Sequence, residues 1–251
     1  MRKFVLLACL IALIAVPSGV YALGLELGVG GWRQKPEGDL SYKGESLDIE
    51  RDLNYESETQ GTGRLKVDMP LAIPNIYLMY TPIEFEGYGQ KTANFTFGNK
   101  TFTGNVPFYS KLTLDHLDVG LYYGIPLLKT ATLKKLNIDL GINVRIIDFK
   151  AEVRQDATGI SETKDMTLYV PMIYVGAQLR LVKWLAVEAE ARGIGYSGNH
   201  YLSYTGRLKL KVLGPVWLSG GWRHDDIKVD EKDIKAEATF SGPFAELGVQ
   251  F

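Results

Sequence analysis

The stretch LNIDLGINVRI, residues 136–146, decides the fold class of this chain. Every even position from Leu136 to Ile146 is aliphatic, and every odd position is Asn, Asp, Gly or Arg. Successive side chains of a β-strand point to opposite faces of a sheet, whereas a helix repeats its apolar positions every three or four residues. The stretch therefore predicts a long strand with one apolar and one polar face.

The same period of two recurs along the chain, in residues 23–29 (LGLELGV), 64–69 (RLKVDM) and 207–212 (RLKLKV). A soluble β-sandwich also alternates, but its turns recur every 8–12 residues or so. Here the strands are longer, the polar face is rich in Gly and in both signs of charge, and the apolar face is a plain band of Leu, Ile and Val. The pattern therefore predicts an all-β fold, a transmembrane antiparallel up-and-down β-barrel.

Strands and turns together predict ten strands. Eight or twelve remain alternatives, because residues 90–104 could form a hairpin above the membrane. The ten predicted ranges are 23–34, 61–69, 75–87, 108–124, 135–152, 165–181, 185–197, 201–212, 215–226 and 237–251.

The predicted connections alternate between short turns and longer loops, and the first long loop carries many charges. The short turns are 70–74, 125–135, 182–184 and 213–215, and the longer loops are 35–60, 88–107, 153–164, 198–200 and 227–236. Outer-membrane barrels place short turns in the periplasm and long loops outside the cell, and an even strand number returns both termini to the periplasm. Aromatic residues near the predicted strand ends are expected at the membrane interfaces; they are Tyr109, Tyr122, Tyr123, Tyr169, Tyr174, Trp184, Trp217, Trp222 and Phe244.

The first residues have the pattern of an export signal. Basic Arg2 and Lys3 precede an apolar run, residues 4–16, which is shorter than the roughly 20 residues of a transmembrane helix. Residues 17–22 (PSGVYA) break this run and offer a cleavage site, so residues 1–22 are predicted as a cleavable signal peptide and 23–251 as the barrel. Lipoprotein-type processing at Cys9 is the less favoured alternative. The expected location is the outer membrane of a Gram-negative bacterium.

Composition excludes two classes of protein. Cys9 is the only cysteine, so the chain after cleavage cannot be a disulfide scaffold. Removal of Arg2 and Lys3 takes the formal net charge from −1 to −3, too near neutral to indicate a nucleic-acid partner. No later segment has the apolar run of a membrane helix, and the mean hydropathy of −0.03 fits strands with one polar face.

The last residues, AELGVQF, form the most specific motif. Their apolar phase, Ala245, Leu247, Val249 and Phe251, resembles the C-terminal assembly signal of bacterial outer-membrane barrels. A strand of this kind can be captured by strand addition, with alternate side chains entering pockets of the partner. The resemblance implies the barrel assembly machinery as a partner.

Four further motifs, PLAIPN (70–75), LDVGLYY (117–123), GGWR (220–223) and FSGPFA (240–245), extend the resemblance over most of the chain. The chain resembles an uncharacterised family of proteobacterial outer-membrane β-barrel proteins, of the small monomeric class. This resemblance implies a fold, a location and a monomer surrounded by outer-membrane lipid and lipopolysaccharide. It implies no reaction.

The polar phase of the strands is expected to line the lumen. Its acidic members are Glu26, Asp68, Glu84, Glu86, Asp118, Asp139, Glu188, Glu190 and Glu246, and its basic members are Arg64, Lys66, Arg145, Arg180, Arg192, Arg207, Lys209, Lys211 and Arg223. Because an unpaired charge in so narrow a space is unfavourable, these residues are predicted to form an ion-paired network. If 198–200 is the loop, facing residue numbers sum to about 399, which places Glu190 opposite Lys209 and Glu188 opposite Lys211.

The three histidines offer little chemistry. His224-Asp225-Asp226 lies at the outer end of a strand, where barrel proteases keep Asp and His to activate water. His116 and Asp118 are two apart on one strand and are expected to point inward together. The acidic run within 225–233 could hold Ca²⁺ only weakly, and no ligand-type spacing is present. The sequence therefore predicts no catalytic, metal or cofactor site.

The leading functional interpretation is a structural or interaction barrel with a closed lumen, whose loops face lipopolysaccharide or other molecules outside the cell. The alternative is a channel for small solutes or hydrophobic compounds. An outer-membrane hydrolase is the third, and it requires His200 or His224 within hydrogen-bond distance of an Asp or Ser.

Overall fold

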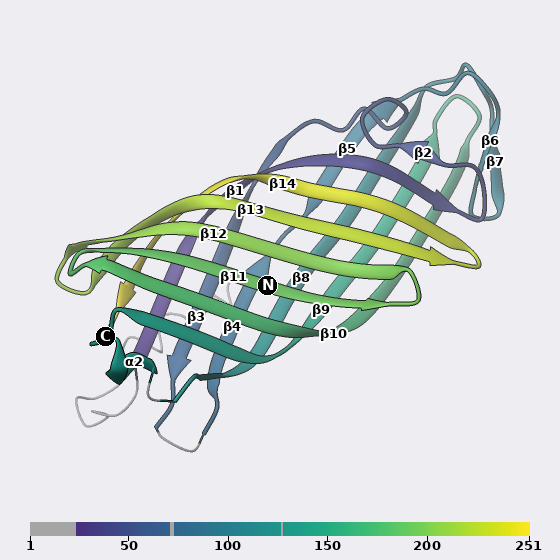
Figure 1. Ribbon diagram of the computed structural model, residues 1–251. Helices are drawn as coiled ribbons and strands as arrows, with labels where there is room; N and C mark the ends of the chain where they lie inside the picture. The colour runs from purple at the N-terminus through teal and green to yellow at the C-terminus, as the bar shows by residue number, and fades with distance from the viewer. Residues whose placement is uncertain (1–23, 71–72, 127) are drawn as a thin grey trace, which may run out of the picture.

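Long antiparallel strands, each hydrogen-bonded to its neighbours, close into a barrel of ten strands (Figure 1). The computed structural model describes residues 24–70, 73–126 and 128–251; the predicted signal peptide lies outside this part. The wall consists of β1 (Gly24–Tyr42), β3 (Glu58–Asp68), β4 (Asn75–Thr81) continued by β5 (Glu84–Gly89), β8 (Phe108–Gly124), β9 (Leu136–Gln155), β10 (Ile160–Val182), β11 (Leu185–Tyr196), β12 (Asn199–Leu213), β13 (Val216–Glu231) and β14 (Ile234–Gln250). Pairing of β1 with β14, from Glu26–Gln250 to Tyr42–Ile234, closes the ring.

The predicted fold is confirmed, and β8 has the predicted bounds. Residues 75–89 act as one strand, since β4 and β5 pair with β8 in a single register on either side of Pro82, which has no N–H to give the ladder. Two predicted loops are wrong. Residues 153–164 and 227–236 are mostly strand, and only 156–159 and 232–233 are turns.

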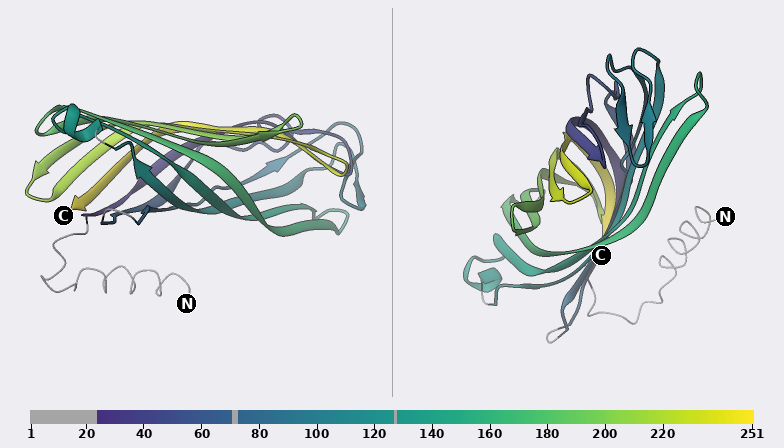
Figure 2. Two further views of the ribbon diagram at one scale, coloured as in Figure 1. Left: turned by 60° about the horizontal axis from the view of Figure 1, so that its bottom comes forward. Right: turned by 90° about the vertical axis from the view of Figure 1, so that its right-hand side faces the viewer.

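The two ends of the barrel differ. The end that holds Gly24, Gln250, the short turns and the helical turn α2 (Leu128–Ala131) is called the terminal rim (Figures 1 and 2). The opposite end, the loop rim, carries β2 (Leu47–Asp48) and a separate hairpin, β6 (Phe95–Phe97) with β7 (Lys100–Phe102). No helix of the described residues is long and apolar enough to cross a membrane.

Near the terminal rim, the outer wall is apolar. On β9 the even residues from Leu136 to Ile146 point outward, and Ile142 is 63% exposed. At about 3.3 Å per residue and a strand tilt of about 40°, this run covers roughly 25 Å along the barrel axis. That height matches the apolar band of an outer-membrane barrel, which is about 25 Å.

Toward the loop rim, the apolar phase switches to the inside of the barrel. On β9 the switch falls between outward Ile146 and buried Ile147; beyond it Val153 is buried, whereas the outward Lys150 forms an ion pair with Glu152. The inward side chains meet residues of the two loops in one apolar plug. The plug contains Trp32, Leu47, Ile49, Leu53, Tyr55, Ile83, Phe85, Phe95, Phe97, Phe102, Phe108, Leu112, Val153, Ala238 and Phe240.

This switch corrects the predicted lumen position of two glutamates. Ile83 and Phe85 point inward, so Glu84 and Glu86 lie on the outer wall, where Glu84 Oε1 is 2.8 Å from Lys111 Nζ. The polar phase faces inward only where the outer wall is apolar. Above that level the wall faces water, and the polar side chains point outward.

The aromatic residues divide between the two faces. Tyr123, Tyr169 and Trp222 are exposed on the outer wall, as predicted, and Trp184 is exposed on a turn of the terminal rim. Tyr122, Tyr174 and Trp217 are buried inside the barrel instead, so their predicted interface position is wrong. Their place in the inward phase of the alternation, shared with charged residues such as Asp118, was the signal for this.

The plug is expected to stabilise the barrel. Phe240 is fully buried and its ring centroid lies 5.7 Å from that of Phe85. Phe240→Ala should lower the free energy of unfolding by about 3–5 kcal/mol, because the cavity cannot collapse between rigid strands. Urea unfolding of the refolded protein would measure this. Tyr88→Ala, at a residue 66% exposed, is the control and should cost less than about 1 kcal/mol; equal losses would contradict a packed plug.

Candidate functional site

Charged side chains fill the barrel between the terminal rim and the apolar plug. The group nearer the terminal rim, the Glu246 cluster, comprises Glu26, Arg64, Lys66, Glu188, Glu190, Arg192, Arg207, Lys209 and Glu246. At its centre, Glu246 Oε2 accepts hydrogen bonds from Arg64 Nη2 and Arg207 Nη1, both at 3.3 Å, and from Ser219 Oγ at 3.2 Å. These donors come from β3, β12 and β13, so the carboxylate ties three strands together.

Glu190 has an even denser set of partners. Its Oε1 lies 3.1 Å from Lys66 Nζ and 3.2 Å from Arg207 Nη2, and its Oε2 accepts from Arg192 Nη2 at 2.9 Å and from the Tyr77 hydroxyl at 3.1 Å. Lys66 and Tyr77 belong to β3 and β4, across the lumen from β11. Glu190 therefore bridges opposite walls of the barrel.

A second group, the Arg145 cluster, lies nearer the apolar plug and consists of His116, Asp118, Arg145, Arg223 and Asp225. Asp118 accepts two hydrogen bonds from Arg145, from Nε at 2.9 Å and Nη2 at 2.8 Å. Arg145 Nη1 also reaches Asp225 Oδ2 at 3.4 Å, and Arg223 Nη2 donates to that oxygen at 2.8 Å. Bidentate pairing of this kind is the strongest form of carboxylate recognition by arginine.

The predicted register between β11 and β12 is wrong by four residues. The numbers of facing residues sum to 395 rather than 399, so Glu188 lies opposite Arg207, and Lys209 lies opposite Ala186. A turn at 197–198 joins the strands, so the centre of the pairing lies two residues earlier than the predicted sum of 399 requires. Because the error is an even number, every side chain keeps its predicted face, and Lys209 Nζ still comes within 3.7 Å of Glu188 Oε1.

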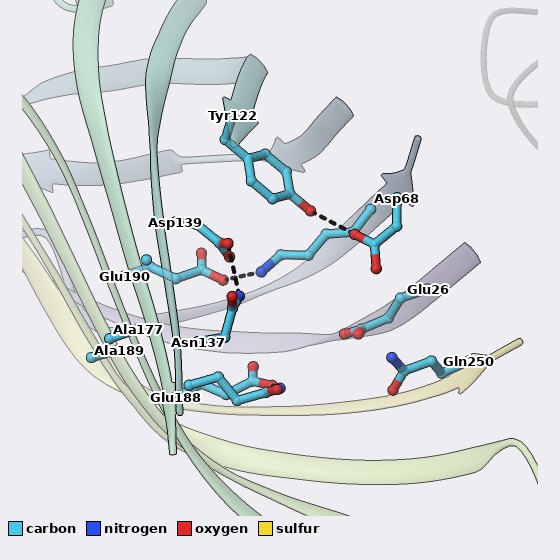
Figure 3. A pocket seen from close by; sticks show the side chains of 13 residues that line it. Glu26, Asp68, Tyr122, Asn137, Asp139, Ala177, Glu188, Ala189, Glu190 and Gln250 are labelled. Carbon is cyan, nitrogen blue, oxygen red and sulfur yellow. Dashed lines mark hydrogen bonds and ion pairs between the residues drawn. The ribbon is translucent and has the colours of Figure 1, made fainter. Parts of the chain in front are cut away.

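Four predicted network residues lie outside these clusters, at the mouth near the terminal rim. Asp68 accepts a hydrogen bond from the Tyr122 hydroxyl at 3.3 Å, and Asp139 accepts one from Asn137 Nδ2 at 2.7 Å (Figure 3). They line a small cavity of about 70 Å³ together with Glu26, Glu188 and Glu190 (Figure 3). Arg180 and Lys211 are exposed at a second cavity, and no ion pair joins either to a carboxylate of the described residues.

Aromatic rings that the sequence analysis did not assign to the lumen complete its filling. The Arg192 guanidinium lies 4.4 Å from the ring centroid of Tyr77, Arg145 lies 4.6 Å from Tyr201, and Arg223 lies 4.5 Å from Trp32. Contacts of cations with ring faces are most favourable where water is excluded. The lumen is thus packed with alternating carboxylates, cations and rings.

These layers close the barrel. A continuous water-filled path would expose the side chains that line it. In the described residues, however, Asp118, Arg145 and Asp225 of the Arg145 cluster have no exposed surface, and Phe85 and Phe240 above them are buried as well. The middle of the interior is therefore filled in the described residues, and the two cavities lie near the terminal rim.

The histidines divide between the two faces of the wall, since His116 points inward and His200 and His224 lie in the outward phases of β12 and β13. His116 points into the lumen, as predicted, where Arg223 Nη2 donates to its Nε2 at 3.1 Å and its Nδ1 faces the Leu114 carbonyl oxygen at 3.0 Å. This places the proton on Nδ1 and makes His116 a neutral acceptor for arginine. His200 Nε2 lies 3.2 Å from Asp226 Oδ2, which meets the distance required for the hydrolase interpretation. The side chains of His200 and Asp226 point outward on the barrel wall, however, and line neither of the two cavities.

No group of three or more His, Cys, Asp or Glu side chains in the described residues is placed to hold a metal ion. The carboxylates of the small cavity are instead used by Lys, Arg, Tyr, Asn and Gln donors.

Comparison with known proteins identifies the fold. No family model and no curated protein matches the chain. The outer membrane protease OmpT from Escherichia coli is similar with a TM-score of 0.54 and 10% identity, over 94% of this chain and 99% of that one. Ail of Yersinia pestis matches with a TM-score of 0.37 and 8% identity, over 92% and 99% of the two chains, and neisserial surface protein A with 0.35 and 11%, over 90% and 97%. The chain thus has the fold of an outer-membrane β-barrel; its place in the uncharacterised family stays a prediction.

Breaking the Arg145 cluster should destabilise the barrel strongly. Arg145→Met leaves Asp118 buried without its cation and should cost about 3–5 kcal/mol of unfolding free energy. Adding Asp118→Leu should recover part of this loss, since Asp225 keeps Arg223. Denaturant unfolding of the single and double variants measures the coupling.

The matched control is Lys228→Met, which removes an outer-wall ion pair with Glu237 (3.1 Å) and should change stability by less than about 1 kcal/mol. A double variant as unstable as the sum of its singles would contradict the coupling.

Proposed function

We propose that this chain is an integral outer-membrane protein that works as a closed structural or interaction barrel, with the loop rim outside the cell. The observation that supports this most directly is the closed middle of the lumen, where the Glu246 and Arg145 clusters and the apolar plug lie one above another. Such filling gives rigidity and leaves the surface of the loops as the part available to partners.

The outer wall supports insertion in a membrane. An apolar band of about 25 Å, bordered by exposed Tyr169 and Trp184, suits the hydrocarbon layer and its interfaces. Lipid can cover this apolar band around one chain, and no second protein chain is needed to bury it. We therefore propose a monomer surrounded by lipid and lipopolysaccharide. We further propose that residues 1–22 are removed as a signal peptide during export.

The loop rim offers charge to an external partner. Arg51 is 82% exposed there, and Lys35 Nζ lies 3.2 Å from Glu50 Oε1. The Arg51 guanidinium, which donates to Asp48, lowers the pKa of that carboxyl below its usual value and so keeps it ionised in acid. Cations of this kind can pair with the phosphate groups of lipopolysaccharide.

The alternative, a channel for small solutes or hydrophobic compounds, has less support. It needs a continuous void, and the open space described here ends at buried ion pairs. A hydrolase has the His200–Asp226 contact in its favour, but both side chains lie on the outer wall and line neither of the two cavities at the terminal rim. The proposal therefore includes no catalytic step, and hydrolysis of a peptide or ester that disappears in His200→Ala would overturn this part.

Planar-bilayer recording tests the closed lumen. The refolded protein, shown to be folded by heat-modifiable migration and to be inserted by protease protection, should give no openings at high salt. Glu190→Gln should be silent too, because the apolar plug still closes the barrel. Steady openings of the unaltered protein, with a conductance that changes in Glu190→Gln, would make the lumen a solute path.

The outward face of the last strand should govern assembly. Ala245 and Leu247 are exposed on β14, and Phe251, the residue after this strand, is exposed too and exchanges backbone hydrogen bonds with Leu25 of β1. Phe251→Ala should slow insertion by the barrel assembly machinery by about tenfold, if the ring enters a pocket during strand addition. Insertion into proteoliposomes with and without the machinery measures this. Phe251→Leu is the control, and equal slowing in the absence of the machinery would contradict a recognition role.

A further inference from the structure

The terminal rim holds a second cavity, which is larger than the acidic cavity described above. Its volume is about 280 Å³, and it lies between the turns at 183–184 and 214–215. It adjoins the acidic cavity of Figure 3, with which it shares Gln178 and Gln250. The two cavities form one open mouth with opposite charge on its two sides.

The larger cavity is lined by four cations, Arg180, Lys183, Lys209 and Lys211, and its described lining contains no Asp or Glu. Lys209 is paired with Glu26, whose Oε2 lies 2.6 Å from its Nζ. The other three make no ion pair with a carboxylate of the described residues. Elsewhere in the lumen each buried cation has an acidic partner, whereas these three cations are exposed at the mouth and face solvent.

A buried donor at the same cavity also lacks a partner. Trp217 is 2% exposed and lines the cavity, and its indole N–H makes no hydrogen bond within the described part of the chain. Its ring lies against Gly28, where a Cβ would come within 2.8 Å of the ring edge. A buried donor without a partner is unfavourable by about 1–3 kcal/mol, but this N–H has no accessible surface and so lies behind the wall of the cavity.

The strands are irregular on both sides of this cavity. The register between β10 and β11 shifts between Arg180 and Val182, and that between β12 and β13 shifts between Lys211 and Leu213. Bulges of this kind redirect neighbouring side chains and are common next to binding sites. Here they lie beside two of the unpaired cations.

From these observations we propose that the cavity at the terminal rim binds a phosphate group. Arg180 supplies a planar fork, and Lys183 and Lys211 supply point charges. A phosphate ester offers enough oxygens to accept from all of them. The acidic cavity alongside repels the anion and confines it to the basic side of the mouth.

The phosphate can come from a lipid headgroup of the inner leaflet or from a soluble phosphate ester. A lipid headgroup as the source rests on the membrane orientation given in the proposed function. The phosphate site itself does not depend on that orientation. Exposed Trp184 and Leu213 on the adjoining turns would lie beside the acyl chains of a bound lipid.

Binding is measured on the refolded protein in an uncharged detergent. Calorimetric titration with inorganic phosphate and glycerol phosphate should show saturable binding that weakens with added salt. Arg180→Gln combined with Lys211→Gln should weaken it by about tenfold or more, since charge-assisted bonds are lost from exposed positions that the fold does not need.

The matched control is Lys150→Gln combined with Lys228→Gln, which removes the same charge from the outer wall and should leave binding unchanged. Native mass spectrometry with phosphatidylglycerol and with uncharged diacylglycerol separates the sources. Retention of phosphatidylglycerol alone, lost in the Arg180/Lys211 variant, indicates a headgroup site; binding of soluble phosphate without lipid indicates a soluble ester.

Absence of saturable binding by both phosphate and lipid, or equal weakening in the control variant, would overturn the site. Bilayer recording stays independent of this result. A protein that conducts yet binds phosphate would overturn the closed barrel and leave the phosphate site in place. A protein that gives no openings and binds no phosphate would overturn the site and leave the closed barrel in place.

Discussion

Each long strand of this barrel has lipid outside it near the terminal rim and water outside it near the loop rim. Its apolar face therefore points outward at the first level and inward at the second. On β9 the outward residues are aliphatic up to Ile146 and charged from Asp148 onward, while the inward residues change from Asn143 and Arg145 to Ile147 and Val153. The hydrophobic effect drives both halves, since each half removes its apolar residues from water, one into lipid and the other into a core. This switch decides where the lumen is charged, where it is apolar and how far the wall rises above the membrane.

The charged level follows from the switch. Where the outer wall is apolar, the polar phase has only the narrow lumen to occupy, and burial there is unfavourable for any charge without a partner. The Glu246 and Arg145 clusters answer this by pairing across the lumen, so that β3 contacts β11 and β14, and β9 contacts β13. Replacing such pairs by apolar residues of similar volume could be equally stable. What the pairs add is a defined arrangement, since the bidentate guanidinium of Arg145 can bond Asp118 in only one orientation.

A barrel closed at its middle has chemistry available only at its two ends. At the loop rim, the loops fold inward into the apolar plug and leave charged side chains on the outside. At the terminal rim, the network ends before the wall does, and Arg180, Lys183 and Lys211 remain without acidic partners. The cations that the clusters do not neutralise are therefore the ones that meet the solvent, beside the buried N–H of Trp217.

The sequence by itself determined the fold class, the ten strands and the face of most side chains, because the period of two is a local property of the extended backbone. It also placed Glu190, Arg207 and Glu246 in the lumen. Only the tertiary structure decided the partners: the register of β11 and β12 depends on a turn of two residues, and pairs such as Lys66–Glu190 join strands far apart in the chain. The outward position of Glu84 and Glu86 likewise escaped prediction, since alternation tells which residues share a face but not which solvent that face meets. That is set by the height at which the closed barrel leaves the lipid.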